Sequence, residues 1–339
     1  MTTPVASEKT GTTRLKGLMA FRESGILLAL VVLVVVLSLY SEAFRSPLNL
    51  MTILKQISVV AIVAMGQTLV IISGYFDLSQ GSVAGLAAIA SAIAAARWGW
   101  PAPVCILFGV GIGAACGFFN GLCITRLRLH PVVVTLATSS IFMGINFVIT
   151  EGTPVTGIPE SFLWIGKGTV SIGPLEIPVP IVAMALTAIL MHLMLTQYLF
   201  GRRIFIIGSN KEAARLAGVN VERVMLGIFT LSGFLAAFGG VIMVGRVGSG
   251  LPLIGSDLLL PVVAASVIGG TLLSGGVGSM AGTVIGAAVM GVLRNGLVVL
   301  RFNIFYQDIV LGFAVLVAVV IDQVRRGNLS FKSVFLGRR

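Results

Sequence analysis

The chain has 339 residues, of which 57% are hydrophobic and only 10% are charged, so it has too little polar surface to cover a soluble globule. Its formal net charge of +11 would fit a nucleic-acid-binding protein only if the basic residues gathered on a folded polar face. They lie between apolar runs, where they mark membrane topology, so the sequence predicts an all-α integral membrane protein with no nucleic-acid partner.

The N-terminal part begins with a basic segment and continues into the first apolar run. Residues 1–24 carry four Lys or Arg, and residues 25–40 are apolar. A cleaved signal peptide would have a shorter apolar region that ends at a small-x-small site, which the sequence around residues 38–43 supplies poorly. We therefore expect a cytoplasmic tail over residues 1–24 and a retained first helix.

About ten segments are apolar and long enough to be membrane helices, and Pro or Gly residues separate them. Residues 46–55 are expected to be an outer connection, and the region between helices 2 and 3 is expected to be broken. Two short segments, 82–96 and 258–273, could be re-entrant instead of spanning. The expected helices cover residues 25–40, 57–73, 82–96, 103–124, 131–149, 179–199, 225–244, 258–273, 278–298 and 306–321.

The stretch GYFDLSQGSVAG, residues 74–85, places a carboxylate between two long apolar runs. A charge is costly at membrane depth, and neighbouring glycines let the backbone unwind where it faces protein or lines a cavity. Asp77 either helps to shape a pathway or the helix break inside the bundle, or caps helix 3 at the membrane surface without touching any ligand. The residues expected at the pathway or helix break are Gly74, Asp77, Ser79, Gln80 and Gly81.

Regularly spaced glycines are expected to bring helices into close contact, because lipid offers no hydrophobic drive for helix association. One ridge is Gly113, Gly117 and Gly121, and the other is Gly278, Gly282 and Gly286. The second ridge begins with GSMAG, which echoes GSVAG at residues 81–85. Such an echo is either chance or the trace of an internal repeat, which is frequent in transporters.

The longest polar and basic interruption is residues 201–223. Asn210 is expected to cap a short helix over residues 211–217, Glu212 lies in its first turn, and Gly218 supplies a left-handed C-cap. So short a helix is marginal alone and needs a groove to lie in. The segment is either a docking element or an ordinary connection between helices. The residues expected to dock are Lys211, Glu212, Ala213, Ala214, Arg215 and Gly218.

The distribution of Lys and Arg predicts the orientation. With the N-terminus inside, 16 of the 23 Lys and Arg fall on the cytoplasmic side, in groups of four, two, five and five. Both termini and the loop 201–223 are then cytoplasmic, and residues 151–178 lie outside. We expect one transmembrane domain over residues 25–321 and a cytoplasmic tail over residues 322–339.

Two patterns in this loop and in the 74–85 stretch resemble a known family. Residues 212–228 reproduce the spacing EAA-x3-G-x9-I of the cytoplasmic loop in permease subunits of ABC importers, although the usual closing Leu-Pro is replaced by Thr230 and Leu231. The Asp77 stretch resembles the Gly-x-Asp-Leu-Ser-Val-Gly-Ser signature of the ribose-type, or monosaccharide, branch. It departs from that signature at Gln80 and at Tyr75 and Phe76.

The resemblance implies a subunit that performs no covalent chemistry. Its partners would be a second permease copy or related chain, a cytoplasmic ABC ATPase and a periplasmic sugar-binding protein, in a bacterial inner membrane. ATP and Mg would bind the ATPase, because this chain has no GxxxxGK[ST] phosphate loop. No metal is expected, since Cys105, Cys116 and Cys123 lack the spacing of zinc ligands and have no histidine nearby.

Other transport functions stay open. The cargo could be a branched-chain amino acid or a nucleoside, because related permeases share this architecture. An ion-coupled secondary transporter would need titratable groups within the bundle, and the sequence offers few: Asp77, Asp308, His192 and Arg294. A scaffold without transport activity would leave the loop 201–223 without a purpose.

Overall fold

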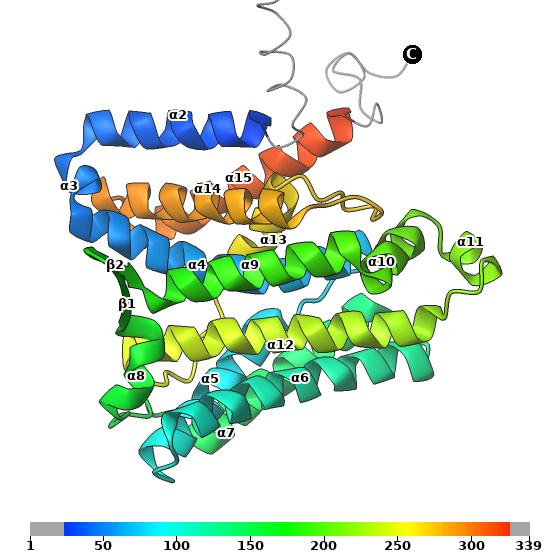
Figure 1. The fold of residues 1–339 in the computed structure, drawn as a ribbon, viewed down its shortest axis with the longest axis horizontal. Coiled ribbons are helices and arrows are strands. Elements are labelled where there is room, and N and C mark those ends of the chain that lie inside the picture. The colour runs from blue at the N-terminus through cyan, green and yellow to red at the C-terminus, as the bar shows by residue number, and fades with distance from the viewer. Residues whose placement is uncertain (1–23, 326–339) are drawn as a thin grey trace, which may run out of the picture.

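The computed structural model describes residues 24–325, so the predicted tails lie outside the described residues except for Ser24 and residues 322–325. Within that range the chain is a bundle of helices that run roughly along one axis (Figure 1). The first part forms α2 (Ser24–Tyr40), α3 (Glu42–Arg45), α4 (Pro47–Ile72), α5 (Gln80–Ala96), α6 (Ala102–Arg126) and α7 (Pro131–Thr150).

A short mixed segment connects α7 to the second part of the chain. It holds α8 (Glu160–Lys167) and an antiparallel hairpin of β1 (Thr169–Ile172) and β2 (Leu175–Pro178), with Thr169 opposite Pro178. The second part forms α9 (Val179–Gln197), α10 (Leu199–Ser209), α11 (Lys211–Leu216), α12 (Val221–Val247), α13 (Leu259–Ile268), α14 (Met280–Val299) and α15 (Ile304–Arg325).

Six helices within the described residues are long and apolar enough to cross a membrane: α4, α6, α7, α9, α12 and α14. Four shorter apolar helices lie where the remaining predicted segments were expected: α2, α5, α13 and the 305–317 part of α15. The membrane-protein class is therefore confirmed. The all-α class is correct except for the hairpin. Its two strands have four residues each, too few for alternating apolar and polar residues to reveal them in the sequence.

Three predicted bounds were wrong. Residues 46–55 belong mostly to α4, because Pro47 occupies the first helical turn, where a missing N–H costs nothing, and Ser46 Oγ accepts from Asn49 N at 3.3 Å. Residues 201–209 are the helix α10, not part of an irregular loop. The segment 258–273 contains only the ten residues of α13, roughly 15 Å of helix, about half of a hydrocarbon core.

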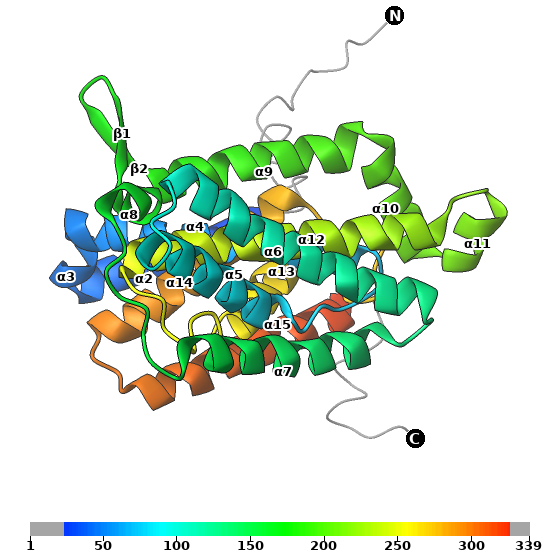
Figure 2. The same ribbon diagram turned by 90° about the horizontal axis from the view of Figure 1, so that it is seen from below.

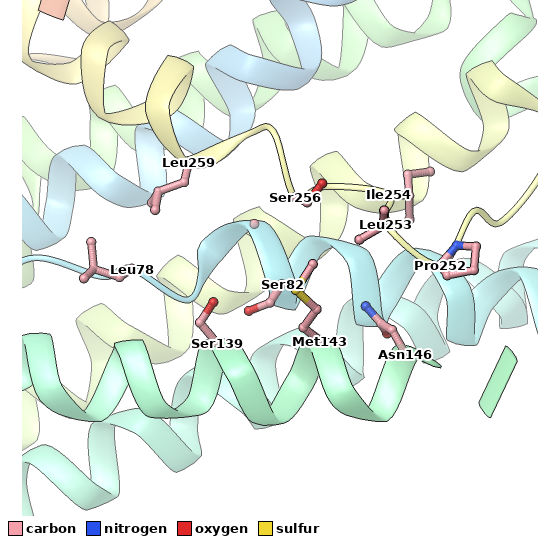
Figure 3. A pocket seen from close by; sticks show the side chains of 11 residues that line it. Leu78, Ser82, Ser139, Met143, Asn146, Pro252, Leu253, Ile254, Ser256 and Leu259 are labelled. Carbon is pink, nitrogen blue, oxygen red and sulfur yellow. The ribbon is translucent and has the colours of Figure 1, made fainter. Parts of the chain in front are cut away.

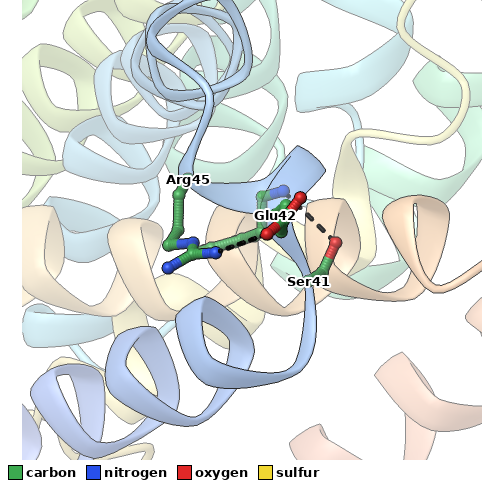
Figure 4. Close-up of polar contacts among 4 residues, drawn as sticks. Ser41, Glu42 and Arg45 are labelled. Atoms are coloured by element: carbon green, nitrogen blue, oxygen red, sulfur yellow. Dashed lines mark hydrogen bonds and ion pairs between the residues drawn. The ribbon is translucent and has the colours of Figure 1, made fainter.

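The corner between α2 and α4 is a capped turn (Figure 4). Ser41 Oγ accepts from Phe44 N at 3.3 Å, and Arg45 meets Glu42 at 3.4 Å across the single turn of α3. Both charged side chains are largely exposed, so this ion pair adds little stability. The buried Phe44 ring anchors the corner to the bundle.

The long helix α12 occupies the centre of the bundle, packed against α4, α5 and α6. Its glycines and alanines let neighbouring backbones approach closely, and many of its residues are buried. On the other side of α4 lie α13 and α14, with α2 against α14 and α15 against α13. Hence α4 and α12 together join the two halves of the molecule.

The two ends of the bundle differ (Figures 1 and 2). One end carries α10 and α11, with α11 standing out beyond the long helices. The Ser24 end of α2 and the Arg325 end of α15 point toward it. The opposite end carries α3, α8 and the hairpin.

Candidate functional site

The first candidate site is the break between α4 and α5. Helix α4 ends at Ile72, Ser73 is its C-cap, and Gly74 follows with φ +86°, a left-handed conformation that favours glycine. Helix α5 begins at Gln80, which leaves residues 73–79 as irregular backbone. The structure thus breaks the helix in the predicted region, with Gly74 at the start of the break.

Asp77 is buried in this break, with 1% of its surface exposed. Ser79 donates to Asp77 Oδ1 twice, from its backbone N at 2.9 Å and from Oγ at 2.6 Å. Ser232 Oγ, on α12, donates to Asp77 Oδ2 at 3.0 Å. Both carboxylate oxygens are therefore used, which is what a carboxylate needs when it is buried.

The hydrogen bonds continue from Asp77 into two more helices. Gln80 Nε2 on α5 donates to Ser232 Oγ at 2.7 Å, and Asn120 Nδ2 on α6 donates to Ser79 Oγ at 2.8 Å. We call these five residues, Asp77, Ser79, Gln80, Asn120 and Ser232, the Asp77 network. It joins the break to α5, α6 and α12, so these elements are tied together deep in the bundle.

The predicted pathway residues divide into two groups. Asp77, Ser79 and Gln80 are at most 1% exposed and belong to the Asp77 network, whereas Gly81 lies at the wall of a cavity described below. The sequence could not show that Asn120 and Ser232 belong with them, because they lie 41 and 155 residues from their partners. A role of Asp77, Ser79 or Gln80 in direct contact with cargo stays a prediction.

The second candidate site is α11 and its flanks. Asn210 Oδ1 accepts from Ala213 N at 2.9 Å, and Gly218 has φ +77°, so the local caps are those expected from the sequence. The helix ends at Leu216, one residue earlier than expected. Of its alanines, Ala214 is buried, and Ala213 is exposed.

The outer surface of α11 combines charge with one large apolar side chain. Arg215 and Glu212 form an exposed ion pair at 3.9 Å, and Leu216 is 88% exposed. Docking surfaces have an apolar centre and a polar rim, and on this projecting helix the exposed leucine fits the centre and the two charged side chains fit the rim. Leu216 was not among the residues expected to dock, although it is the one large apolar side chain in the predicted helix 211–217.

Lys211 connects the two candidate sites. Its Nζ donates to the hydroxyl of Tyr75 at 2.6 Å and lies 5.4 Å from the centre of that ring. Tyr75 is the second residue of the 74–85 stretch, immediately after Gly74. Lys211 and Tyr75 therefore join α11 to the break that contains Asp77.

The glycine ridges face neighbouring backbones. A Cβ at Gly113 would collide with Ala237 and Gly233 of α12, and a Cβ at Gly117 would collide with the Phe229 carbonyl. A Cβ at Gly121 would come within 2.9 Å of Leu226. The second ridge faces the end of α13: Gly282 against the Gly269 carbonyl and Gly286 against the Ala265 carbonyl. Gly278 lies two residues before α14 begins, against Ile72.

A cavity of about 90 Å³ lies between α5, α7 and the connection from α12 to α13 (Figure 3). Ser139, Met143 and Asn146 project from α7 toward Ser82 on α5, and residues 252–256 close the other wall. No local sequence pattern indicates this cavity, because separate segments of the chain form its walls. Among the described residues, no three His, Cys, Asp or Glu side chains gather as a metal site.

Comparison with known proteins adds one matching family and three similar proteins. A family model described as "Branched-chain amino acid transport system / permease component" matches residues 49–320. The ribose import permease protein RbsC of Bacillus subtilis is 39% identical over 303 residues, which cover 88% of this chain and 92% of that protein. The fructose import permease protein FrcC of Rhizobium meliloti is 34% identical over 284 residues, 83% and 79% of the two chains. The galactose/methyl galactoside import permease protein MglC of Haemophilus influenzae is 32% identical over 318 residues, 90% and 95%.

Proposed function

The chain belongs to the branched-chain amino acid transport system / permease component family, and on that premise we propose that it is the membrane subunit of an ATP-driven importer that carries a monosaccharide into the cytoplasm. The relatives support sugar as the cargo, because their names are those of ribose, fructose and galactose import permeases. The family name alone would equally fit a branched-chain amino acid.

One observation carries the mechanism: α11 projects from the bundle and is joined through Lys211 and Tyr75 to the break that holds Asp77. We infer that a cytoplasmic ABC ATPase docks on α11, through Lys211, Glu212, Ala213, Ala214, Arg215 and Gly218 together with Leu216. ATP and Mg bind that partner. The end of the bundle with α11 is then cytoplasmic, in agreement with the distribution of Lys and Arg in the sequence.

We infer the remaining partners from the resemblance to permeases of ABC importers. A periplasmic sugar-binding protein docks at the end with α8 and the hairpin, and a second copy of the chain or a related chain completes the pathway. Residues 25–321 act as one permease domain in a bacterial inner membrane, with both terminal tails in the cytoplasm. The segments 82–96 and 258–273 do not both cross the membrane alone, since α13 covers only half of it.

The proposed transport cycle needs no covalent chemistry in this chain. When the ATPase dimer closes, α11 moves with it and pulls the break through Lys211 and Tyr75. The Asp77 network makes α5, α6 and α12 respond as one unit, because a rearranged network would leave a buried carboxylate without donors. The energy comes from the different affinity of the ATPase for the two states of the permease.

The test is reconstitution in liposomes. The chain together with its ATPase and sugar-binding protein should accumulate radiolabelled monosaccharide when ATP is supplied inside. The chain alone, under an imposed proton or sodium gradient, should accumulate none. Robust accumulation by the chain alone would replace the ATP-driven importer with a secondary transporter, and accumulation of branched-chain amino acid only would replace the cargo.

A further inference from the structure

The connection between α12 and α13, residues 248–258, descends into the bundle alongside α5. A Cβ added to Gly250 would lie 3.1 Å from the Ala92 side chain, and a Cβ added to Gly81 would lie 2.6 Å from the Gly255 carbonyl oxygen. Between these two points the Ile254 carbonyl contacts Gly85. The connection therefore runs beside α5 from Gly81 to Ala92, roughly 16 Å of helix. This explains why α13 is so short: non-helical chain covers the rest of the distance.

Non-helical backbone at membrane depth is tolerated where it is buried in protein or lines a polar cavity. Discontinuous helices at that depth commonly mark the cargo site of a transporter. Here the non-helical chain is packed against α5 and also lines a cavity, since residues 252–256 form one wall of the 90 Å³ cavity (Figure 3). One water needs about 10–15 Å³ of such space, so the cavity has room for several waters or for one small polar ring.

The polar groups of the cavity are incompletely used by the protein. Asn146 is 2% exposed, and its Oδ1 has no hydrogen-bond partner within residues 24–325. The Asn146 side chain points from α7 into the cavity, as does Ser139. Ser82 Oγ donates to the Ser79 carbonyl at 2.8 Å, so it can still accept a hydrogen bond. The atom of Asn146 that is directed at the cavity is its amide nitrogen, which can donate to a ligand oxygen, while Ser82 Oγ can accept from a ligand hydroxyl (Figure 3).

The remaining lining has no charge. Leu78, Met143 and Leu259 provide apolar surface, and no Lys, Arg, Asp or Glu lines the cavity. An anionic or zwitterionic ligand would find no counter-ion here and would lose its hydration. A monosaccharide ring matches the lining, because it combines an apolar ring face with hydroxyls that both donate and accept.

We propose that this cavity is a binding station for one monosaccharide ring during transport, in which Asn146 and Ser139 bond sugar hydroxyls and Met143 and Leu259 contact the ring face. The inference rests on the proposed function, because it requires that the cargo be a sugar. Few polar groups and one small cavity give a weak site, which suits release in the next step of transport.

The first test measures uptake by the complete assembly in liposomes, with ribose, fructose and galactose tried in turn. Asn146→Leu and Ser139→Val remove one hydrogen-bonding group each, and each should lower initial uptake about tenfold, while ATP hydrolysis stimulated by the binding protein stays within about twofold of wild type. Ser140→Val is the matched control, since Ser140 is the next hydroxyl on α7, exposed on its other face, and bonds only the Leu136 carbonyl. It should leave uptake unchanged.

The two hypotheses fail in different ways. A wild-type assembly that moves no sugar would overturn the proposed function, and the inference with it. Sugar uptake by wild type that is unchanged in Asn146→Leu and Ser139→Val would overturn only the inference. A shift in the preference among the three sugars would support contact with cargo, since a purely structural role would slow all of them equally.

The second test does not depend on how well those variants fold. Ser139→Cys and Ser140→Cys are introduced into a chain whose Cys105, Cys116 and Cys123 are replaced by Ala, and each is treated with a water-soluble thiol reagent. A high concentration of the transported sugar should slow the modification of the cysteine at position 139 by severalfold, up to about tenfold. It should leave the rate at position 140 unchanged. Modification at 139 by lipophilic reagents only, without protection by sugar, would mean that the cavity holds lipid, and would overturn the inference.

Discussion

Two breaks in the bundle lie at the end that carries α11, and each leads into a helix at a Gly-Ser-x-Ala-Gly sequence. The first is residues 73–79, before α5, and the second is residues 269–279, before α14. When GSVAG and GSMAG are aligned, buried Asp77 in the first break corresponds to exposed Ser274 in the second. The breaks occupy equivalent places, but different forces hold them.

Side chains hold the first break, and backbone holds the second. Asp77 has three hydrogen bonds from side chains and backbone around it. In the second break, Gly276 N donates to the Ile72 carbonyl at 2.8 Å, and Gly270, Gly275 and Gly276 all have positive φ. A buried charge needs surroundings built for it, whereas a glycine loop needs only space, so the two breaks should respond differently to mutation.

The breaks also meet α10 and α11 separately. Tyr75 of the first contacts Lys211 of α11, and Gly276 of the second lies against Ser209 of α10. They touch each other where Gly275 approaches Gly74. The α10–α11 arm therefore contacts the first break through a flexible side chain and the second through backbone.

The largest effect is expected for Asp77→Leu. It leaves Ser79 and Ser232 without their acceptor in the core, which should destabilise the fold by about 3 kcal/mol and lower uptake strongly, while the ATPase stays associated. Ser274→Leu, at the equivalent position of the second break, is the control and should change the melting temperature little, because Ser274 is exposed. Melting in detergent, uptake and pull-down measure the three effects. Equal effects of the two variants would refute the difference between the breaks.

The next effect is expected for Gly276→Ala, which tests the backbone-held break. Its φ of +74° is unfavourable for alanine, and the new Cβ would lie 2.6 Å from Ser209 Oγ, so we expect about 2 kcal/mol of destabilisation. Gly270→Ala is the matched control: φ is +86°, but the nearest atom is 3.9 Å away, so only about 1 kcal/mol of backbone strain remains. The difference between their melting temperatures isolates the contact with α10. No difference would mean that the second break is not braced by α10.

These expectations separate what sequence predicts from what it does not. The cap at Asn210, the left-handed Gly218 and the break after Gly74 depend on neighbours in the chain, and the structure places all three as expected. Helix α10 was missed because Gly201, Arg202 and Arg203 read as a polar loop, although Ile204 and Ile207 form a buried face.

The unpredicted part of the site depends on distant pairs. Asp77 meets Ser232 across 155 residues and Lys211 meets Tyr75 across 136, and no local rule selects those partners. The cavity depends on the path of an irregular connection, residues 248–258, alongside α5, and no local pattern predicts that path. Local preference fixes caps and turns, whereas packing decides which polar groups meet.

A moderate effect is expected for Gly218→Val, which tests whether the first break senses the angle of α11. Valine at φ +77° costs about 1–2 kcal/mol, so the end of α11 should adopt another conformation and direct the helix away from its groove. Nothing lies within 4 Å of the Cβ position, so no clash in the bundle contributes. Sugar-stimulated ATP hydrolysis should become uncoupled from uptake, with binding-protein affinity unchanged. Coupled transport at the wild-type ratio would show that the turn does not aim α11.

A smaller effect is expected for the contact between α11 and the first break. Tyr75→Phe and Lys211→Met should each cost about 0.5 kcal/mol of stability or less, because the contact is exposed. Their effect on uptake per ATP should be larger than this and should not add in the double variant, since either change alone breaks the link. Additive effects on coupling would mean that α11 reaches the break by another route.

The smallest effect on the fold is expected for Glu212→Lys. Glu212 is exposed in the first turn of α11, where its charge favours the helix dipole and pairs with Arg215 at 3.9 Å, together a few tenths of a kcal/mol. Neither break contacts it, so the melting temperature and both breaks should be unchanged. Reversal of its charge next to Lys211 and Arg215 should nevertheless weaken ATPase docking by about threefold to fivefold, because the surface offered to the partner becomes wholly basic. Pull-down in nanodiscs measures the docking, and salt titration supplies the control, since an electrostatic loss shrinks as ionic strength rises. Wild-type docking at low salt would show that the ATPase recognises α11 through Leu216 and the helix backbone, and that the charges of this arm serve only the first break.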